Sequence, residues 1–113
     1  MADVQRTILN PSSASRPLGA YSMAALVTGG RLLFVAGQVP VDAAGKLVGG
    51  GDAAAQTRQV FQNLGQVLEG AGASFSDVVE FTTYLVGRES VQPFIQARTK
   101  LFPQIFPNAD YPP

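Results

Sequence analysis

The sequence has no cysteine and no histidine among its 113 residues. Disulfide bonds, thiol nucleophiles, Ser-His-Asp triads and zinc sites of the usual nitrogen and sulfur type are therefore excluded. Any catalysis by this chain must use arginine, lysine, tyrosine, carboxylates, hydroxyls, backbone groups or water.

An excess of charge of one sign is also lacking. Eight basic and eight acidic side chains cancel, charged residues make up 14% of the chain, and no block of like charge occurs. Because nucleic-acid binding needs a basic stripe, we expect no nucleic-acid partner. No apolar run approaches the roughly 18 residues of a membrane span, and the first residues do not begin a signal peptide. We therefore predict a soluble, cytoplasmic protein without membrane contact.

Apolar residues are nevertheless abundant, at 46% of the chain. A chain of this length can form one domain with a real core but is too short for two, so we expect residues 1–113 to be a single domain. The low charged fraction, together with apolar surface to hide, favours association with other chains.

The most informative stretch is the run Leu-Leu-Phe-Val-Ala-Gly-Gln-Val-Pro at residues 32–40. Its unbroken apolar start, rich in Val and Phe, predicts a strand buried on both faces. Gly37 permits close approach of a backbone or a ligand, and Pro40 cannot donate to a sheet ladder, so pairing should end there. The strand end then offers backbone N–H groups and the Gln38 amide as a ligand site; the alternative is a simple tight turn.

A second strand is predicted over residues 21–28, because the glycines at 29–30 separate two strand-like runs as in a tight β-hairpin. This hairpin would place Tyr21 near the Gly37-Gln38 end of its partner. An aromatic hydroxyl and an amide would then meet at one end of the sheet.

Two helices are predicted from apolar residues at three- and four-residue spacing. Asp52 is a good N-cap for the first helix, which should end at Gly70 or Gly72. The second should run from Ser90 to about Phe102. Gln56 and Asn63 could be functional polar groups, although solvated positions or packing against a neighbour explain them more simply. Arg98 and Lys100 are most simply interpreted as solvated.

Further strands are predicted at residues 5–9 and 46–48 and, as the central strand, at 78–86. The order strand, helix, strand predicts a right-handed βαβ crossover. Residues 103–113 contain four prolines and no strand pattern, so we expect them to pack poorly on their own subunit. Either another chain covers the surface left bare there or, as we favour, the sequence is the front part of a longer protein.

Short motifs along the chain follow the order in which they occur in one known family. They are Gly19-Ala20-Tyr21-Ser22, Val35-Ala36-Gly37-Gln38-Val39-Pro40, Gln56-Thr57, Asn63-Leu64, Val67-Leu68, Ala71-Gly72-Ala73 and Asp77-Val78-Val79. On these motifs nearly the whole chain resembles the RidA/YjgF family of reactive-intermediate (imine) deaminases, without that family's C-terminal strands.

The resemblance implies an α+β fold of the chorismate-mutase-like type, with two helices packed on one face of a sheet, and a homotrimer with clefts between subunits. It implies hydrolysis of reactive 2-imino or enamino acids to 2-keto acids and ammonia in such a cleft, with a small carboxylate metabolite as ligand. No metal or organic cofactor is implied.

The resemblance also implies roles for individual residues of this sequence, at the positions that match the family's motifs. Tyr21 matches the family's cleft tyrosine, and Gly37-Gln38 matches the strand end beside the substrate. Tyr111 and the prolines after it resemble the start of the family's Pro-Ala-Arg segment, whose arginine binds the substrate carboxylate and would follow Pro113. The substrate-binding candidates are therefore Tyr21, Gly37, Gln38 and Tyr111, with no catalytic residue or metal ligand assigned.

Two positions depart from the family pattern. Ala36 stands where active members usually carry serine, and Ile95 where many carry asparagine. The family's water-positioning glutamate lies in a final strand beyond this sequence. Three functions stay open: an imine or enamine deaminase or a hydrolase with a changed substrate, a non-catalytic trimeric small-metabolite-binding or regulatory protein, and nucleic-acid cleavage, which the zero net charge disfavours. An arginine directly after Pro113 would favour the first over the second.

Overall fold

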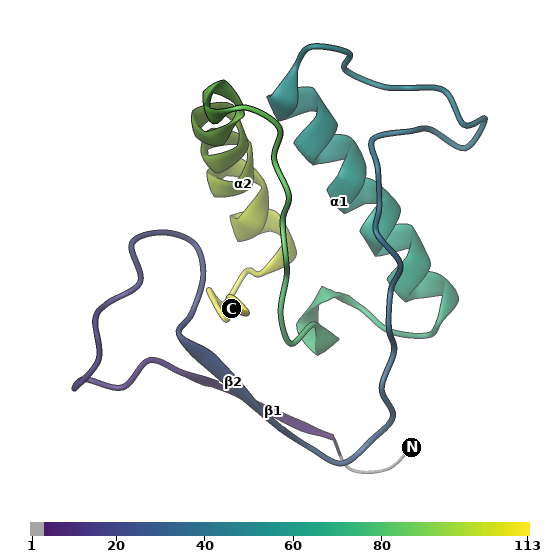
Figure 1. Ribbon diagram of the computed structural model, residues 1–113. Coiled ribbons are helices and arrows are strands. Elements are labelled where there is room, and N and C mark those ends of the chain that lie inside the picture. The colour runs from purple at the N-terminus through teal and green to yellow at the C-terminus, as the bar shows by residue number, and fades with distance from the viewer. Residues whose placement is uncertain (1–3) are drawn as a thin grey trace.

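The computed structural model describes residues 4–113 (Figure 1). Its regular elements, in chain order, are strands β1 (Gln5–Leu9) and β2 (Ala24–Thr28) and helices α1 (Ala53–Gly70) and α2 (Val91–Ile105), with short 3-10 helices at Phe75–Asp77 and Arg88–Ser90. Figure 1 shows α1 and α2 side by side, running in the same general direction, with the two-stranded ribbon near one end of the pair. The α+β class is confirmed in this coarse form.

Helix α1 forms where its sequence signals predict it. The Asp52 carboxylate accepts a hydrogen bond from the Ala55 amide at 3.1 Å, which satisfies one of the free N–H groups of the first turn. Phe61 and Leu68, two turns apart, are buried and give the helix its apolar face. The helix ends at Gly70, as predicted.

Helix α2 begins one residue after the predicted start and ends at Ile105, three residues beyond the predicted end. Pro103 lies inside its last turn, where it removes only its own N–H from the helix ladder. The Phe106 amide donates to the Phe102 carbonyl at 2.7 Å and closes the end. Phe94 and Phe102 are buried on the face toward α1.

The sheet differs from the prediction because β2 pairs with β1 rather than with residues 32–39. Leu9 lies opposite Ala24 in an antiparallel ladder. The Asn10 side chain lies at the end of this ladder, where its Oδ1 accepts from the Met23 amide at 3.0 Å beside the start of β2. The predicted hairpin is therefore wrong, although the glycines at 29–30 do adopt the positive φ expected of a tight turn.

Residues 32–40 and 78–86, predicted as buried strands, form no strand among residues 4–113, and the predicted βαβ crossover is wrong for the same reason. A strand requires a neighbouring strand with which it forms a ladder, and neither segment has one in the described part of the chain. Phe34 is accordingly 87% exposed and Tyr84 90% exposed. Around the predicted strand at 46–48 there is only an isolated bridge between Val41 and Leu47.

The core is a cluster of aromatic rings between the helices. Phe61, Phe94, Phe102 and Phe106 are buried. The Phe102 ring meets those of Phe61 and Phe106 edge-on, at centroid distances of 5.3 and 5.2 Å. Such edge-to-face contacts add to the stabilisation from burial alone.

The chain end packs on this core, so the prediction that residues 103–113 pack poorly is wrong. Phe106 is 4% exposed, and Pro112 is fully buried. The Pro112 carbonyl accepts from the Ser22 amide at 3.4 Å, and the Pro113 carbonyl accepts from the Phe81 amide at 2.9 Å. Prolines cannot donate to a ladder, but their carbonyls still accept, and here they hold two distant segments together.

Candidate functional site

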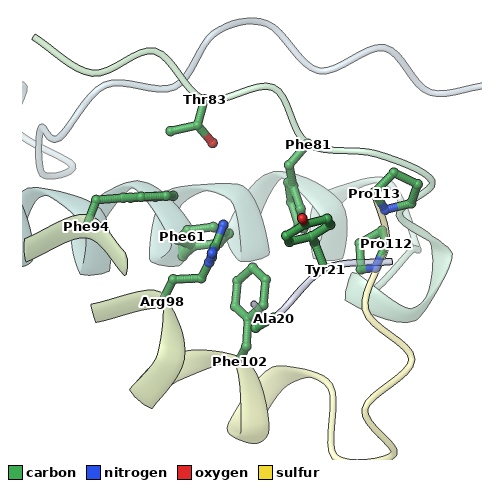
Figure 2. A pocket seen from close by; sticks show the side chains of 10 residues that line it. All are labelled: Ala20, Tyr21, Phe61, Phe81, Thr83, Phe94, Arg98, Phe102, Pro112 and Pro113. Atoms are coloured by element: carbon green, nitrogen blue, oxygen red, sulfur yellow. The ribbon is translucent and has the colours of Figure 1, made fainter. Parts of the chain in front are cut away.

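A cavity of about 150 Å³ lies where α1, α2, the loop before β2 and the chain end meet (Figure 2). Its walls are phenylalanine rings from three different segments: Phe61, Phe81, Phe94 and Phe102. Ala20 and the two final prolines close the remaining side. A space of this volume lined by such rings holds a molecule of about the size of benzene.

Three polar side chains line the same cavity: Tyr21, Thr83 and Arg98. Figure 2 shows the Arg98 guanidinium and the Thr83 hydroxyl pointing toward one another across the space. No aspartate or glutamate side chain lines the cavity in the part of the chain that the structure describes. The cavity therefore combines an apolar wall with hydroxyl groups and one positive charge.

Tyr21 is held at this cavity by its own loop. Its backbone amide donates to the Gly19 carbonyl at 2.9 Å, and its phenolic oxygen accepts from the Leu18 amide at 3.2 Å. The following residue, Ser22, is 4% exposed and anchors the loop to the chain end. Because the phenolic oxygen acts as acceptor toward Leu18, the O–H proton stays free to be donated to a ligand.

Arg98 is not a solvated residue of α2, as the sequence interpretation held. Its guanidinium carbon lies 5.3 Å from the centroid of the Phe94 ring, and its Nε is buried without a hydrogen-bond partner among residues 4–113. A Cβ on Gly19 would come within 3.1 Å of Nη2, so the absence of a side chain there leaves room for the guanidinium. The sequence did hold a signal, because Arg98 lies four residues from both Phe94 and Phe102 and so shares their face of the helix.

The other predicted site residues lie elsewhere. Gln38 lines a separate open hollow of about 350 Å³ together with Asp42 and Asn63, and its amide donates to the Ala36 carbonyl at 3.1 Å. Gly37 is exposed, with open space where a Cβ would stand. Within one chain, the structure therefore does not bring these two residues together with Tyr21.

Tyr111 belongs to the aromatic core. Its ring stacks on Phe102 at a centroid distance of 5.9 Å and meets Phe106 at 6.1 Å. It directly precedes Pro112, which lines the cavity with Tyr21. Tyr111 thus supports the cavity wall from behind.

The described residues 4–113 contain neither a metal-binding cluster nor a membrane-spanning helix. Within them no group of three or more carboxylate, histidine or cysteine side chains is placed to hold a metal ion. None of their helices has the length and apolar character needed to cross a bilayer.

Comparison with known proteins identifies the family of this chain. A family model described as Endoribonuclease L-PSP, which represents the RidA/YjgF proteins, matches residues 12–112. The chain belongs to the RidA/YjgF family. The resemblance seen in the sequence motifs is thereby confirmed.

Relatives of this RidA-family chain include proteins with a named activity. The 2-iminobutanoate/2-iminopropanoate deaminase of Rattus norvegicus is 40% identical over 86 residues, which are 75% of this chain and 61% of the relative. A RutC family protein of Pyrococcus horikoshii is 40% identical over 80 residues, 71% of this chain and 62% of the relative. The chain thus spans less than two thirds of the length of these curated relatives.

A solved structure is also similar. It is a protein of unknown function of the conserved Rid protein family from Yersinia pestis, with a TM-score of 0.77 and 38% identity, covering 88% of this chain and 76% of that one. The two helices and the β1–β2 ribbon described above are compatible with the Rid fold.

Proposed function

We propose that this RidA-family chain hydrolyses short 2-imino acids to 2-oxo acids and ammonia. The observation that carries the proposal is Tyr21, which lines a small cavity and whose hydroxyl, an acceptor toward the Leu18 amide, keeps its proton for a ligand. Family membership supports the reaction, because the rat relative is named a 2-iminobutanoate/2-iminopropanoate deaminase. We further propose, from the family resemblance, that a cleft between subunits completes the site.

In this reaction water adds to the electrophilic imine carbon, and the C–N bond then breaks. One iminium acid and one water give one 2-oxo acid and one ammonium ion, so atoms and charge balance. The step needs a placed water and fixed hydrogen-bond donors rather than a strong nucleophile. Tyr21 supplies one such donor, and the phenylalanine walls keep bulk water from the apolar part of the substrate.

Replacing Tyr21 with phenylalanine tests the proposal. We expect the Tyr21→Phe variant to hydrolyse 2-iminobutanoate about tenfold more slowly, because one hydrogen bond worth about 1.4 kcal/mol is lost. The substrate is generated in the cuvette by a pyridoxal-phosphate dehydratase, and release of 2-oxobutanoate above the uncatalysed rate is measured. The free energy of unfolding should change by about 1 kcal/mol or less.

Lys100→Ala is the control, since Lys100 lies at an exposed position of α2 and does not line the cavity. Equal rates for wild type and Tyr21→Phe would show that Tyr21 is structural. A wild-type protein that binds 2-oxobutanoate yet never accelerates hydrolysis would instead support the non-catalytic, metabolite-binding function.

We also propose that the chain acts as a homotrimer. The number three comes from the family resemblance, and association itself is supported by exposed apolar side chains on the two extended segments. On residues 31–40 and 78–86, Leu32 is 82% exposed, Phe34 87% and Tyr84 90%. Figure 1 shows both segments running along the helix pair. Exposed apolar surface of this kind marks an interaction site.

Sedimentation velocity measures this association. At about 10 μM we expect a species of about 36 kDa, three times the 11.9 kDa of one chain. The double variant Phe34→Ser and Tyr84→Ser should sediment as a monomer, and Arg58→Ser, at an exposed position of α1, should sediment like wild type. A wild-type monomer at that concentration would contradict the proposal.

A further inference from the structure

We propose that Leu18 is a positioning residue for Tyr21, and that its backbone N–H group fixes and polarises the Tyr21 hydroxyl. This role deepens the proposed function and rests on it for the part that Tyr21 plays in hydrolysis. Leu18 directly precedes the motif at residues 19–22 and lies outside it. Its side chain is 96% exposed and packs on almost nothing among residues 4–113, so a role of this residue within one chain lies in its backbone.

The segment from Leu18 to Tyr21 forms a closed loop of its own. The Tyr21 amide donates to the Gly19 carbonyl at 2.9 Å, which turns the chain within three residues. The Tyr21 ring lies back along this turn, because its Cδ1 and Cε1 atoms are 3.9 Å from where a Cβ on Gly19 would stand. The Leu18 amide meets the phenolic oxygen at 3.2 Å and closes the loop at the far end of the side chain. Both ends of Tyr21 are thus held by backbone groups of the residues just before it.

The hydrogen bond from Leu18 acts on the Tyr21 hydroxyl in two ways. A phenolic oxygen carries one proton and also accepts hydrogen bonds. When the Leu18 amide fills an acceptor position, the O–H proton is left for another partner and is directed away from Leu18. A donor bound to an oxygen also draws electron density from it, and this polarisation strengthens the hydrogen bond that the same oxygen donates. The Leu18 amide therefore makes Tyr21 a better donor toward an imine or the attacking water.

Replacing the Leu18 amide with an ester tests this role, because the exchange removes one N–H group and keeps the leucine side chain. The ester is introduced during translation as the α-hydroxy acid of leucine. We expect the ester protein to hydrolyse 2-iminobutanoate about three- to fivefold more slowly than wild type. In a Tyr21→Phe background the same ester should slow hydrolysis by less than about 1.5-fold, since no hydroxyl is left to position. An equal factor in both backgrounds would show that the amide is only structural and would overturn the proposal.

Ordinary mutagenesis gives a second comparison at the same residue. Leu18→Pro removes the N–H group, whereas Leu18→Ala keeps it and shortens only the side chain. Leu18→Ala should therefore hydrolyse 2-iminobutanoate faster than Leu18→Pro. A Leu18→Ala protein as slow as Leu18→Pro would show that the side chain matters instead of the amide.

A nuclear magnetic resonance measurement leaves residue 18 unchanged. The amide proton of Leu18 should move upfield in Tyr21→Phe, because its acceptor is lost while the ring stays in place. In wild type, added 2-oxobutanoate should move the same proton downfield, because donation by the hydroxyl strengthens the bond that its oxygen accepts. In Tyr21→Phe the ligand should leave it in place. A Leu18 proton that fails to move in either of the first two comparisons would overturn the proposal.

The rates also separate this role from the proposed function. If Tyr21→Phe hydrolyses 2-iminobutanoate at the wild-type rate, the role of Tyr21 is wrong, and the role of Leu18 is wrong with it. If Tyr21→Phe is slow but the ester protein is as fast as wild type, only the role of Leu18 is wrong.

Discussion

Phe102→Ala should lower the free energy of unfolding by about 3–5 kcal/mol, the largest stability effect that we expect from one substitution in this chain. Phe102 is 2% exposed, and its ring lies in contact with those of Phe61, Phe106 and Tyr111. Truncation removes the buried apolar area and leaves a cavity, because rings fixed by one another relax only partly. Urea unfolding at one fixed protein concentration measures the loss.

The loss should extend to the chain end and to the candidate site. Tyr111 stacks on Phe102, and the prolines after it hold Ser22 and Phe81 through their carbonyls. Phe102→Ala should therefore raise hydrogen exchange at the Ser22 and Phe81 amides.

Two comparison variants distinguish the loss of the buried Phe102 ring from a general effect of substitution in α2 on the free energy of unfolding. Phe102→Leu should lose less stability than Phe102→Ala because it leaves a smaller cavity. Lys100→Ala changes an exposed position of the same helix and should stay within about 0.5 kcal/mol of wild type. A loss below about 1 kcal/mol for Phe102→Ala would show that the aromatic cluster is not the core.

The helices could be predicted from sequence because their signals are local. Asp52 reaches an amide only three residues away, and the apolar spacing within α1 needs no partner to be read. The apolar spacing predicts α2 in the same way, except for its last turn, which contains Pro103.

The strands could not be predicted in the same way, because a strand is defined by its neighbour. Residues 32–40 have the composition of a buried strand, yet Phe34 is 87% exposed where no described segment pairs with it. The bond from the Met23 amide to the Asn10 side chain at the end of the β1–β2 ladder spans thirteen residues and leaves no periodic signal in the sequence.

The candidate site was predictable only in part. Tyr21 was identified by its motif, and the structure places it at a cavity. An arginine on a helix is most simply predicted to be solvated, but the spacing of Arg98 from Phe94 and Phe102 places it on the core face of α2.

Asn63→Asp should destabilise the protein by about 2–3 kcal/mol, although the side chain keeps its size. The Asn63 amide donates to the carbonyls of Val39 at 3.1 Å and Val41 at 2.9 Å, and its oxygen accepts from Gln59 at 2.8 Å. These bonds attach the extended segment to α1. Aspartate has no N–H to donate and sets a negative charge against two carbonyl oxygens, so both bonds are lost and repulsion is added.

The matched control for this change is Gln62→Glu, the neighbouring exposed position of α1. It introduces the same charge where no hydrogen bond of Gln62 is broken, and it should shift the free energy of unfolding by no more than about 0.5 kcal/mol. In Asn63→Asp, release of the segment should also raise hydrogen exchange at the Val48 amide, which donates to the Pro40 carbonyl at 2.8 Å. If Asn63→Asp unfolds at the same urea concentration as Gln62→Glu, the segment is held by its apolar contacts, and the Asn63 bonds contribute no net stability.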